Sequence, residues 1–131
     1  MRLLMEVLSS RVLLRPTDPD RSQRFYGELL SLAVYREYGQ GASRGVVYFL
    51  GGGFLEVAGR SDSPAGDKLR LWVQVRDVDA THRDLLARGV EVTQPPRTEP
   101  WGLREMWLAD PDGVSIVVVE VPEDHPLRRR L

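Results

Sequence analysis

The side chains able to do acid–base, nucleophilic or metal chemistry are few in this chain of 131 residues. It contains no cysteine and two histidines, His82 and His125. The lack of cysteine excludes a thiol nucleophile, a thiolate metal site and a disulfide, and removes any need for an oxidising compartment. A Ser-His-Asp triad is unsupported, because His82 falls inside a predicted helix and His125 in a polar tail. The remaining candidates are arginines, carboxylates and aromatic rings.

Two arginines occupy equivalent places in predicted strands, Arg11 in residues 11–15 and Arg70 in residues 69–75. Successive strand residues point to opposite faces of a sheet. If the aliphatic residues of these strands pack under helices, the side chains left to meet a ligand are Arg11, Leu13, Arg15, Arg70, Trp72 and Gln74. A guanidinium fork matches a carboxylate or a phosphate, so the two arginines predict a site for an anionic group.

Glu56 is the carboxylate best placed to meet these arginines, since it lies in a predicted strand over residues 54–58. The simplest expectation is a structural ion pair, a charge-assisted hydrogen bond with one of the two arginines. The alternative is that Arg11 or Arg70 stays available for an anionic group of a ligand. Removing each arginine in turn and measuring ligand retention separates these two interpretations.

Aromatic residues in the strands are candidates for an apolar lining of the same surface, although such residues are more often part of a core. Tyr48 and Trp72 have the stronger claim as lining residues. The side of the sheet taken by Trp107 depends on a strand register that the sequence leaves open.

Two other motifs invite a chemical interpretation but are better explained as turns. Gly51–Gly53 leads into a predicted strand, whereas a phosphate-binding loop leads into the N-terminus of a helix. Asp110 and Asp112 lie in an Asp-Pro-Asp-Gly sequence typical of a turn, which argues against paired catalytic carboxylates.

The first half of the chain predicts one helix and four strands that position these residues. After the strand over 11–15, Asp18 and Pro19 supply an N-cap and a first helical residue. Apolar residues then recur at helical spacing from Phe25 to Leu32. Further strands are expected at 33–38, 45–50 and 54–58, with the glycine triplet turning the last hairpin.

The second half repeats this order after a polar linker over residues 61–68. A strand over 69–75 precedes a helix that is capped by Asp77 and ends at Gly89. Strands at 90–93, 104–108 and 115–121 complete the set. The residues from Pro122 onward are expected to form a solvated, frayed tail.

The two halves align at a fixed offset, with Asp18 opposite Asp77 and Asp20 opposite Asp79, which indicates an internal repeat. The chain is too short for two comfortable cores, so the two halves are expected to share a sheet. We therefore expect an α+β fold in a single domain over residues 1–131. Its two modules cover about 8–60 and 68–122, followed by a flexible tail over 123–131.

Composition narrows the class of protein further. The 42% hydrophobic and 28% charged residues are typical of a globular chain. A net charge of −1 and a pI near 6.1 provide no positive field for nucleic acid or an anionic membrane. The segment Met1–Val7 lacks signal-peptide features, and no apolar run approaches the roughly 20 residues of a membrane span. A cytoplasmic location is expected.

Three segments together resemble the glyoxalase/bleomycin-resistance/extradiol-dioxygenase superfamily, also called vicinal oxygen chelate. They are RVLLRPTDPDRSQRFYGELL, LRLWVQVRDVDATHRDLLARG and WGLREMWLADPDGVSIVVVE. The resemblance implies two tandem βαβββ modules whose curved mixed sheets form half-barrels, paired in a homodimer with grooves at the subunit boundary. Known members include metal-dependent isomerases and dioxygenases, fosfomycin-inactivating thiol transferases and metal-free proteins that sequester drugs such as bleomycin.

The resemblance also implies where a metal would be held, at positions that correspond here to Arg11, Glu56, Arg70 and Val117. Arginine stays protonated and valine has no donor atom, so Glu56 alone could bind a cation. A zinc-like centre needs three or four protein ligands. No metal and no other cofactor are therefore expected.

Trp101 and Gly102 begin a WG-x-R-E pattern, completed by Arg104 and Glu105, that resembles one carried by drug-binding members of the family. The indole could offer a flat face to an aromatic ligand, worth on the order of 1 kcal/mol beyond its area. Alternatively, Trp101 packs into the contact between two subunits.

The leading expectation is a metal-independent protein that binds a neutral or anionic small molecule, with sequestration of an antibiotic as one such role. The ligand-binding candidates are Arg11, Leu13, Tyr48, Glu56, Arg70, Trp72 and Trp101, and no catalytic residue is assigned. One alternative is an enzyme of the same superfamily: a metal-independent lyase or isomerase with Glu56 as base, or a dioxygenase-like metal enzyme. Adjacent arginines would lower the pKa of such a base, which counts against it. The other alternative is a dimerisation module with a vestigial groove.

Overall fold

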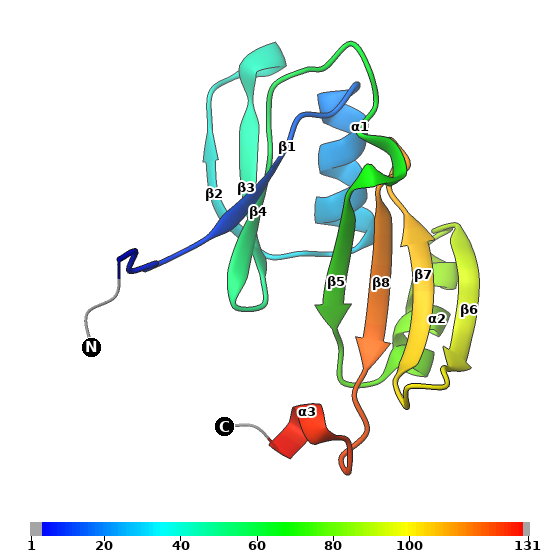
Figure 1. The fold of residues 1–131 in the computed structure, drawn as a ribbon. Coiled ribbons are helices and arrows are strands. Elements are labelled where there is room, and N and C mark those ends of the chain that lie inside the picture. Colours follow the sequence, from blue (N-terminus) through cyan, green and yellow to red (C-terminus); the bar gives the residue numbers. More distant parts are fainter. Residues whose placement is uncertain (1–3, 130–131) are drawn as a thin grey trace.

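A computed structural model describes residues 4–129 as two modules, each a four-stranded sheet with a helix against it (Figure 1). The first module contains β1 (Arg11–Leu14), α1 (Pro19–Arg24), a π-helical turn (Phe25–Leu29), β2 (Val34–Tyr38), β3 (Gly45–Leu50) and β4 (Gly53–Val57). The second contains β5 (Arg70–Gln74), α2 (Val78–Ala87), β6 (Val92–Thr98), β7 (Arg104–Ala109) and β8 (Ser115–Glu120), followed by α3 (Pro126–Arg129). Short 3-10 turns lie at Gly41–Ser43 and Gly66–Lys68.

The two sheets have the same strand order, β1-β4-β3-β2 and β5-β8-β7-β6. In each sheet the first and last strands of the module pair in parallel, and the other neighbours pair antiparallel. This confirms the expected α+β architecture of two βαβββ modules.

Both helices begin where the sequence predicts, because an aspartate accepts a hydrogen bond from a free backbone N–H of the first turn. The Asp18 carboxylate accepts from the N–H of Arg21 at 3.2 Å, and the Asp77 carboxylate accepts from the N–H of Ala80 at 3.0 Å. None of the helices within residues 4–129 has the length and apolar character needed to cross a bilayer.

Two segments differ from the sequence prediction. The strand expected at 90–93 is β6, which runs instead over Val92–Thr98 and includes Pro95 and Pro96. Prolines are tolerated there because β6 is an edge strand, and its register shifts twice along β7.

The segment expected to be a frayed tail folds back as far as residue 129. Leu127 donates its N–H to the His125 ring, and Arg128 donates to the carbonyl of Val121. The expectations for the N-terminal segment and for the C-terminal tail include residues 1–3 and 130–131, which lie outside the described residues.

One hydrophobic core spans both modules on the side of the sheets that carries α1 and α2. Its members from the strands include Leu14, Val46, Tyr48, Leu55, Val57, Leu71, Met106, Leu108, Ile116 and Val118. The expectation that the two halves share a sheet is wrong, because each module forms a four-stranded sheet of its own. The modules share this core instead, since a short chain cannot bury two separate ones.

A buried polar contact also joins the modules. The Tyr26 hydroxyl, next to α1, donates to Asp110 Oδ2 at 2.7 Å, and Thr17 donates through both its N–H and its hydroxyl to the Asp112 carboxylate. The Asp110 carboxylate also accepts from the N–H groups of Asp112 and Val114, as expected for a turn. The Asp-Pro-Asp-Gly turn therefore holds the first module against the second.

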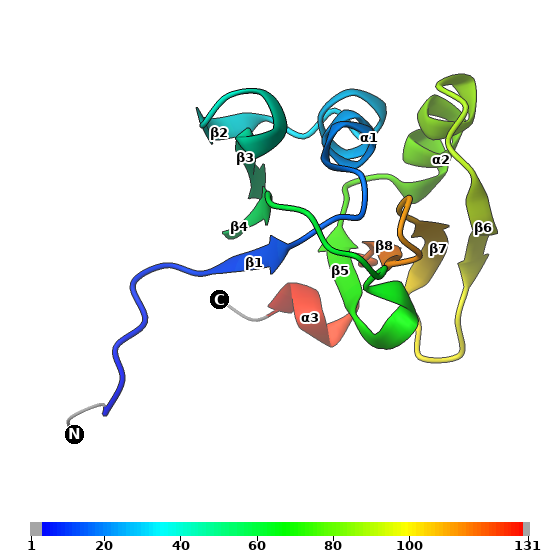
Figure 2. The ribbon, with the colours of Figure 1, turned by 90° about the horizontal axis from the view of Figure 1, so that it is seen from above.

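Seen from above, α1 and α2 lie on the same side of the molecule, and the two sheets are turned relative to each other (Figure 2). We call the face of each sheet that points away from its helix the open face. The two open faces of one chain point in different directions, so they do not close on each other.

Candidate functional site

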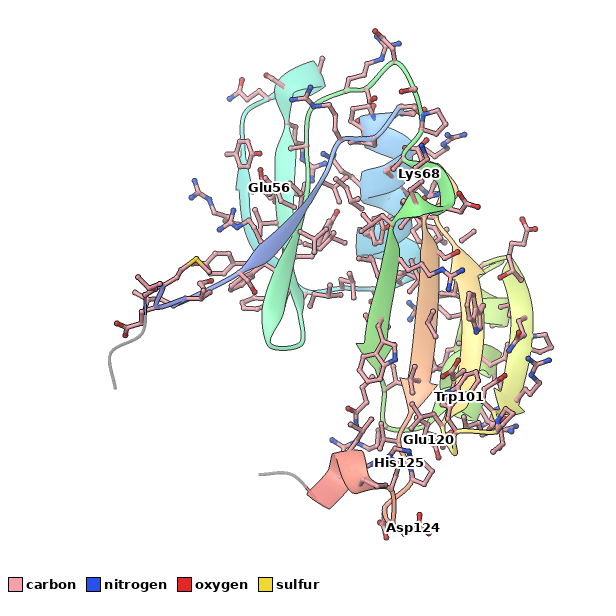
Figure 3. The ribbon with its side chains drawn as sticks, viewed as in Figure 1. Glu56, Lys68, Trp101, Glu120, Asp124 and His125 are labelled. Carbon is pink, nitrogen blue, oxygen red and sulfur yellow. The ribbon has the colours of Figure 1, made fainter. Side chains whose placement is uncertain are left out.

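The open face of the first sheet brings Arg11, Tyr38 and Glu56 together. In the register, Leu13 of β1 and Val47 of β3 both pair with Glu56 of β4, which puts the Glu56 side chain on the face away from α1 (Figure 3). Arg11 Nη1 donates to Glu56 Oε1 at 2.6 Å, and the Tyr38 hydroxyl donates to Glu56 Oε2 at 2.6 Å.

These two hydrogen bonds set the acid–base properties of the site. The bond from Tyr38, followed by that from Arg11, lowers the pKa of Glu56 below its usual value. The same contact with Glu56 raises the pKa of Tyr38. Both carboxylate oxygens are engaged and the carboxylate is a weaker base than usual, so the arrangement is poorly suited to general-base catalysis near neutral pH.

An aromatic patch, formed by Tyr35, Phe49 and Phe54, lies beside this cluster. The ring centroids are 5.3 Å apart for Tyr35 and Phe49, 4.7 Å for Tyr35 and Phe54, and 5.6 Å for Phe49 and Phe54. Tyr35 and Phe49 are nearly half exposed. The Arg11 guanidinium carbon lies 5.9 Å from the Phe54 ring centroid, within the range of a cation–π contact.

Arg36 is a second cation at the edge of this face. It pairs with Val47 in the register and lies 5.8 Å from the Tyr38 ring centroid. Within residues 4–129 it has no ion-pair partner. A guanidinium without a carboxylate beside an exposed aromatic patch can meet the anionic group of an aromatic ligand.

The open face of the second sheet is largely apolar. Val117 of β8 pairs with Trp72 of β5 on one side and with Trp107 of β7 on the other, which puts these three residues on one face. Trp72 is half exposed. Arg70 lies 5.0 Å from the Trp107 ring centroid and, like Arg36, has no ion-pair partner among the described residues.

The loop before β7 presents Trp101 to solvent, with 57% of its surface exposed. Its indole N–H donates to Glu105 Oε2 at 2.7 Å, which leaves the ring face free of this bond. The His125 ring folds against the loop, with Nε2 3.1 Å from the Trp101 carbonyl oxygen (Figure 3). Arg104, also in the motif, faces the other side and pairs with Asp79 of α2 through two contacts of 2.9 Å.

The structure therefore divides the predicted site residues between two faces. Arg11, Leu13 and Glu56 lie together on the first sheet, with Glu56 paired as expected with one arginine. Arg70 and Trp72 lie on the second sheet, so the expectation that Glu56 faces both arginines is not met within the chain. Trp107, left open by the sequence, shares the open face with Trp72.

The prediction that Tyr48 lines the groove is wrong. Tyr48 is 2% exposed, belongs to the core, and donates its hydroxyl to the carbonyl of Gln23 in α1 at 2.9 Å. The strand phase is shifted by one residue, so Phe49 takes the place on the open face that was expected for Tyr48.

The four positions that the family resemblance assigns to metal ligands do not fit a metal centre. Arg11 and Arg70 offer no lone pair, Val117 offers no donor, and both oxygens of Glu56 accept hydrogen bonds. The acidic group of Asp77, Asp79 and Glu120 lies elsewhere, at the start of α2. Each of its members already has a structural partner: the Ala80 N–H, the Arg104 side chain and the Val78 N–H respectively.

Sequence reasoning missed Tyr35, Arg36, Tyr38, Phe49 and Phe54. Phe54 precedes Glu56 by two residues, so strand alternation was a sufficient signal to place it on the same face. The strand β2 gave a weaker signal, because all five of its residues are exposed and a bulge interrupts its pairing with β3.

Comparisons with solved structures support the fold. A glyoxalase/bleomycin resistance protein/dioxygenase from Nocardioides superposes with a TM-score of 0.74 at 18% identity, covering 95% of this chain and 90% of that one. A superfamily member from Sphaerobacter thermophilus DSM 20745 gives 0.69 at 27% identity, covering 89% and 99%. A lactoylglutathione lyase from Agrobacterium tumefaciens gives 0.68 at 19% identity, covering 90% and 96%.

No match was found among curated proteins. A family model, however, matches residues 9–118, which is most of the chain. Its description is the glyoxalase/bleomycin resistance protein/dioxygenase superfamily. The match and the duplicated fold agree, and the chain belongs to this superfamily.

Proposed function

We propose that this chain is a metal-independent binding protein that takes a small, aromatic, neutral or anionic molecule onto its open faces. The observation that carries the proposal is the exposed patch of Tyr35, Phe49 and Phe54 beside the guanidinium groups of Arg11 and Arg36. Sequestration of an antibiotic is one role that fits such a site.

The charges favour an anion over a cation as the ligand. Glu56 is neutralised by Arg11, whereas neither Arg36 nor Arg70 has a carboxylate partner among the described residues. A cationic ligand would therefore meet unpaired positive charge on both sheets. An anionic group can form charge-assisted hydrogen bonds with these arginines, while the rings contribute on the order of 1 kcal/mol per stacked pair beyond buried area.

Two copies of the chain would complete the site. The open faces of one chain point in different directions, so a groove with two walls requires the first sheet of one copy to face the second sheet of another. Such a homodimer would place Arg11 and Glu56 of one copy opposite the indoles of Trp72 and Trp107 of its partner. A purely structural dimer with a vestigial groove would instead bury the aromatic patch completely.

An enzymatic role has weaker support. A lyase or isomerase that used Glu56 as its base would need a raised pKa, and the hydrogen bonds from Tyr38 and Arg11 lower it. A dioxygenase or metal-dependent isomerase would need ligands that Arg11, Arg70 and Val117 do not provide. The likeness to a lactoylglutathione lyase, at 19% identity, concerns the fold.

The proposal is tested with 8-anilinonaphthalene-1-sulfonate, an aromatic anion whose fluorescence rises in apolar surroundings. Saturable binding should weaken by about tenfold, or roughly 1.4 kcal/mol, in Arg36→Gln or Arg70→Gln, because each removes an unpaired cation. Arg24→Gln on the helix side, where Arg24 pairs with Glu28, is the matched control and should bind normally. Equal binding by all variants, or stoichiometric zinc, iron, nickel or manganese in purified protein, would refute the proposal. Mass spectrometry of co-purifying molecules then identifies the ligand.

A further inference from the structure

A cleft of about 510 Å³ lies between the two modules. We call it the inter-module cleft. The end of the first helical segment, at Leu30 and Leu32, and the turn Gly51–Gly52 of the β3–β4 hairpin form one side, while β5 and α2, with Thr81 and Leu85, form the other. In Figure 1 this hairpin lies beside β5. The volume falls within the roughly 300–1,000 Å³ of small-molecule sites.

The walls of the cleft are apolar and carry no charge. None of its lining residues, all within the described part of the chain, is an acid, a lysine, an arginine or a histidine. A charged ligand would lose its hydration there without an opposite charge in return, which is strongly unfavourable. An uncharged occupant is therefore favoured.

A few polar groups could orient such an occupant. The Thr81 hydroxyl donates to the carbonyl of Asp77 at 2.8 Å, so its oxygen can still accept a hydrogen bond. Gln74 of β5, an exposed residue of the lining, offers an amide donor and acceptor. The Tyr26 hydroxyl also borders the cleft, but it is already committed to Asp110. One or two polar groups in an otherwise apolar site are typical of small-molecule recognition.

Gly51 and Gly52 of the hairpin turn border the cleft on one side, which we call its mouth. A Cβ atom added at Gly51 or Gly52 would have no heavy atom within 4 Å apart from its neighbours in the chain. The backbone of Gly51 has a φ of 58°, which favours glycine, whereas Gly52 is not in that region. A larger side chain at Gly52 is therefore compatible with the turn and adds bulk at the border of the cleft.

We infer that the inter-module cleft is a second binding site, adjacent to the open faces, for an uncharged and mainly apolar small molecule. The ligand would have a compact hydrocarbon or aromatic body and one polar group within reach of Thr81 or Gln74. The cleft shares Phe49, Trp72 and Gln74 with strand positions that point to an open face. Its other lining residues do not belong to those faces, so the inference does not depend on the function proposed for them.

The test uses N-phenyl-1-naphthylamine, an uncharged probe whose fluorescence rises in apolar sites. The full-length protein should bind it at one saturable site. Gly52→Phe at the mouth and Thr81→Leu on the opposite wall should each weaken binding by about tenfold by occupying the space. The matched controls are Ala42→Phe, on an exposed turn at the other end of the first sheet, and Ala87→Leu, exposed on α2, and both should leave the affinity within about twofold. Urea unfolding of each variant checks that the fold is intact.

Several results would overturn the inference. They are the absence of saturable binding by the native protein, unchanged affinity in both filled variants, or equal losses in the controls. Size-exclusion chromatography adds another: if Gly52→Phe converts a dimer into monomers, the cleft is a contact between copies and the inference is wrong. Arg36→Gln separates the two proposals, because it should weaken the anionic probe and leave the uncharged probe bound.

Discussion

Removal of the Tyr26 hydroxyl should weaken the contact between the two modules. Tyr26 is 1% exposed and donates to Asp110 Oδ2 at 2.7 Å. In Tyr26→Phe this oxygen loses its partner inside the protein, while Oδ1 keeps the N–H groups of Asp112 and Val114. A hydrogen bond to a charged group is worth about 1.5–3 kcal/mol, so we expect the free energy of unfolding to fall by about 2 kcal/mol. For a chain of this size the melting temperature should fall by roughly 7 °C.

Urea unfolding at neutral pH measures this loss, and an unchanged m-value would show that the unfolded state is not the cause. Tyr35→Phe is the matched control, because the Tyr35 hydroxyl has no hydrogen bond to any described residue and its ring is half exposed. This control should change stability by less than about 0.5 kcal/mol. An equally small effect of Tyr26→Phe would refute the claim that the hydroxyl joins the modules.

The same contact predicts a pH dependence. Burial, followed by the charge of Asp110 and the hydrogen bond to it, raises the pKa of Tyr26 far above its usual value. The stabilising effect is therefore fully present below pH 10, the usual tyrosine pKa, and is lost as the pH rises above it, because the unfolded chain then releases a proton that the folded chain keeps. One such group contributes about 1.4 kcal/mol per pH unit. Burial also raises the pKa of Tyr48, so Tyr26→Phe should make the alkaline loss shallower without abolishing it.

Other predictions concern the first open face and a helix cap. A Cβ at Gly45 would lie 2.3 Å from Tyr38 Cζ, so Gly45→Ala should displace the Tyr38 ring. The pKa of Glu56 should then rise towards its usual value, which carbon-detected NMR titration can measure. An unshifted pKa would argue against the hydrogen bond from Tyr38 to Glu56. Because the pKa of Glu56 is lowered in the folded state, the stability that its ionised form contributes should be lost as the pH falls below about 4.5. Urea midpoints measured from neutral to acid pH should therefore fall less steeply in Glu56→Gln than in the native protein. Asp77→Ala removes the cap of α2 and should cost about 1 kcal/mol in urea unfolding, whereas a loss below a few tenths would show that the cap is dispensable.

The parts of the fold predicted correctly from sequence are those in which a local interaction decides the outcome. Asp18 and Asp77 cap their helices through their own side chains, and the alternation around Arg11 and Glu56 marks which side chains share a face. The strand prediction missed the part of β6 that contains Pro95 and Pro96, where strand pairing is tolerated only because β6 is at the edge of its sheet. That depends on distant segments, which local pattern does not reveal.

The misplacement of Tyr48 has a specific physical cause. A strand has two possible phases, and a polar residue at alternate positions normally identifies the exposed face. The strand β3 reads Gly-Val-Val-Tyr-Phe-Leu and contains no charged residue to make that distinction. Its phase is fixed by pairing with β4, where Glu56 lies opposite Val47 and Leu55 lies opposite Tyr48. A correct prediction needed the register of two strands together.

Equivalent positions on the two sheets carry chemically different side chains. Across the first sheet, one row of paired residues reads Leu13, Glu56, Val47 and Arg36, and the equivalent row of the second reads Trp72, Val117, Trp107 and Gln94. The first row contains a carboxylate and a guanidinium, whereas the second row contains two indoles and no charged side chain. In the groove between two copies proposed above, a ligand would meet the Arg36 guanidinium from the first row and the indoles of Trp72 and Trp107 from the second. On that proposal the asymmetry favours a flat molecule with an anionic edge, because its rings can stack on the indoles while its charge meets a guanidinium.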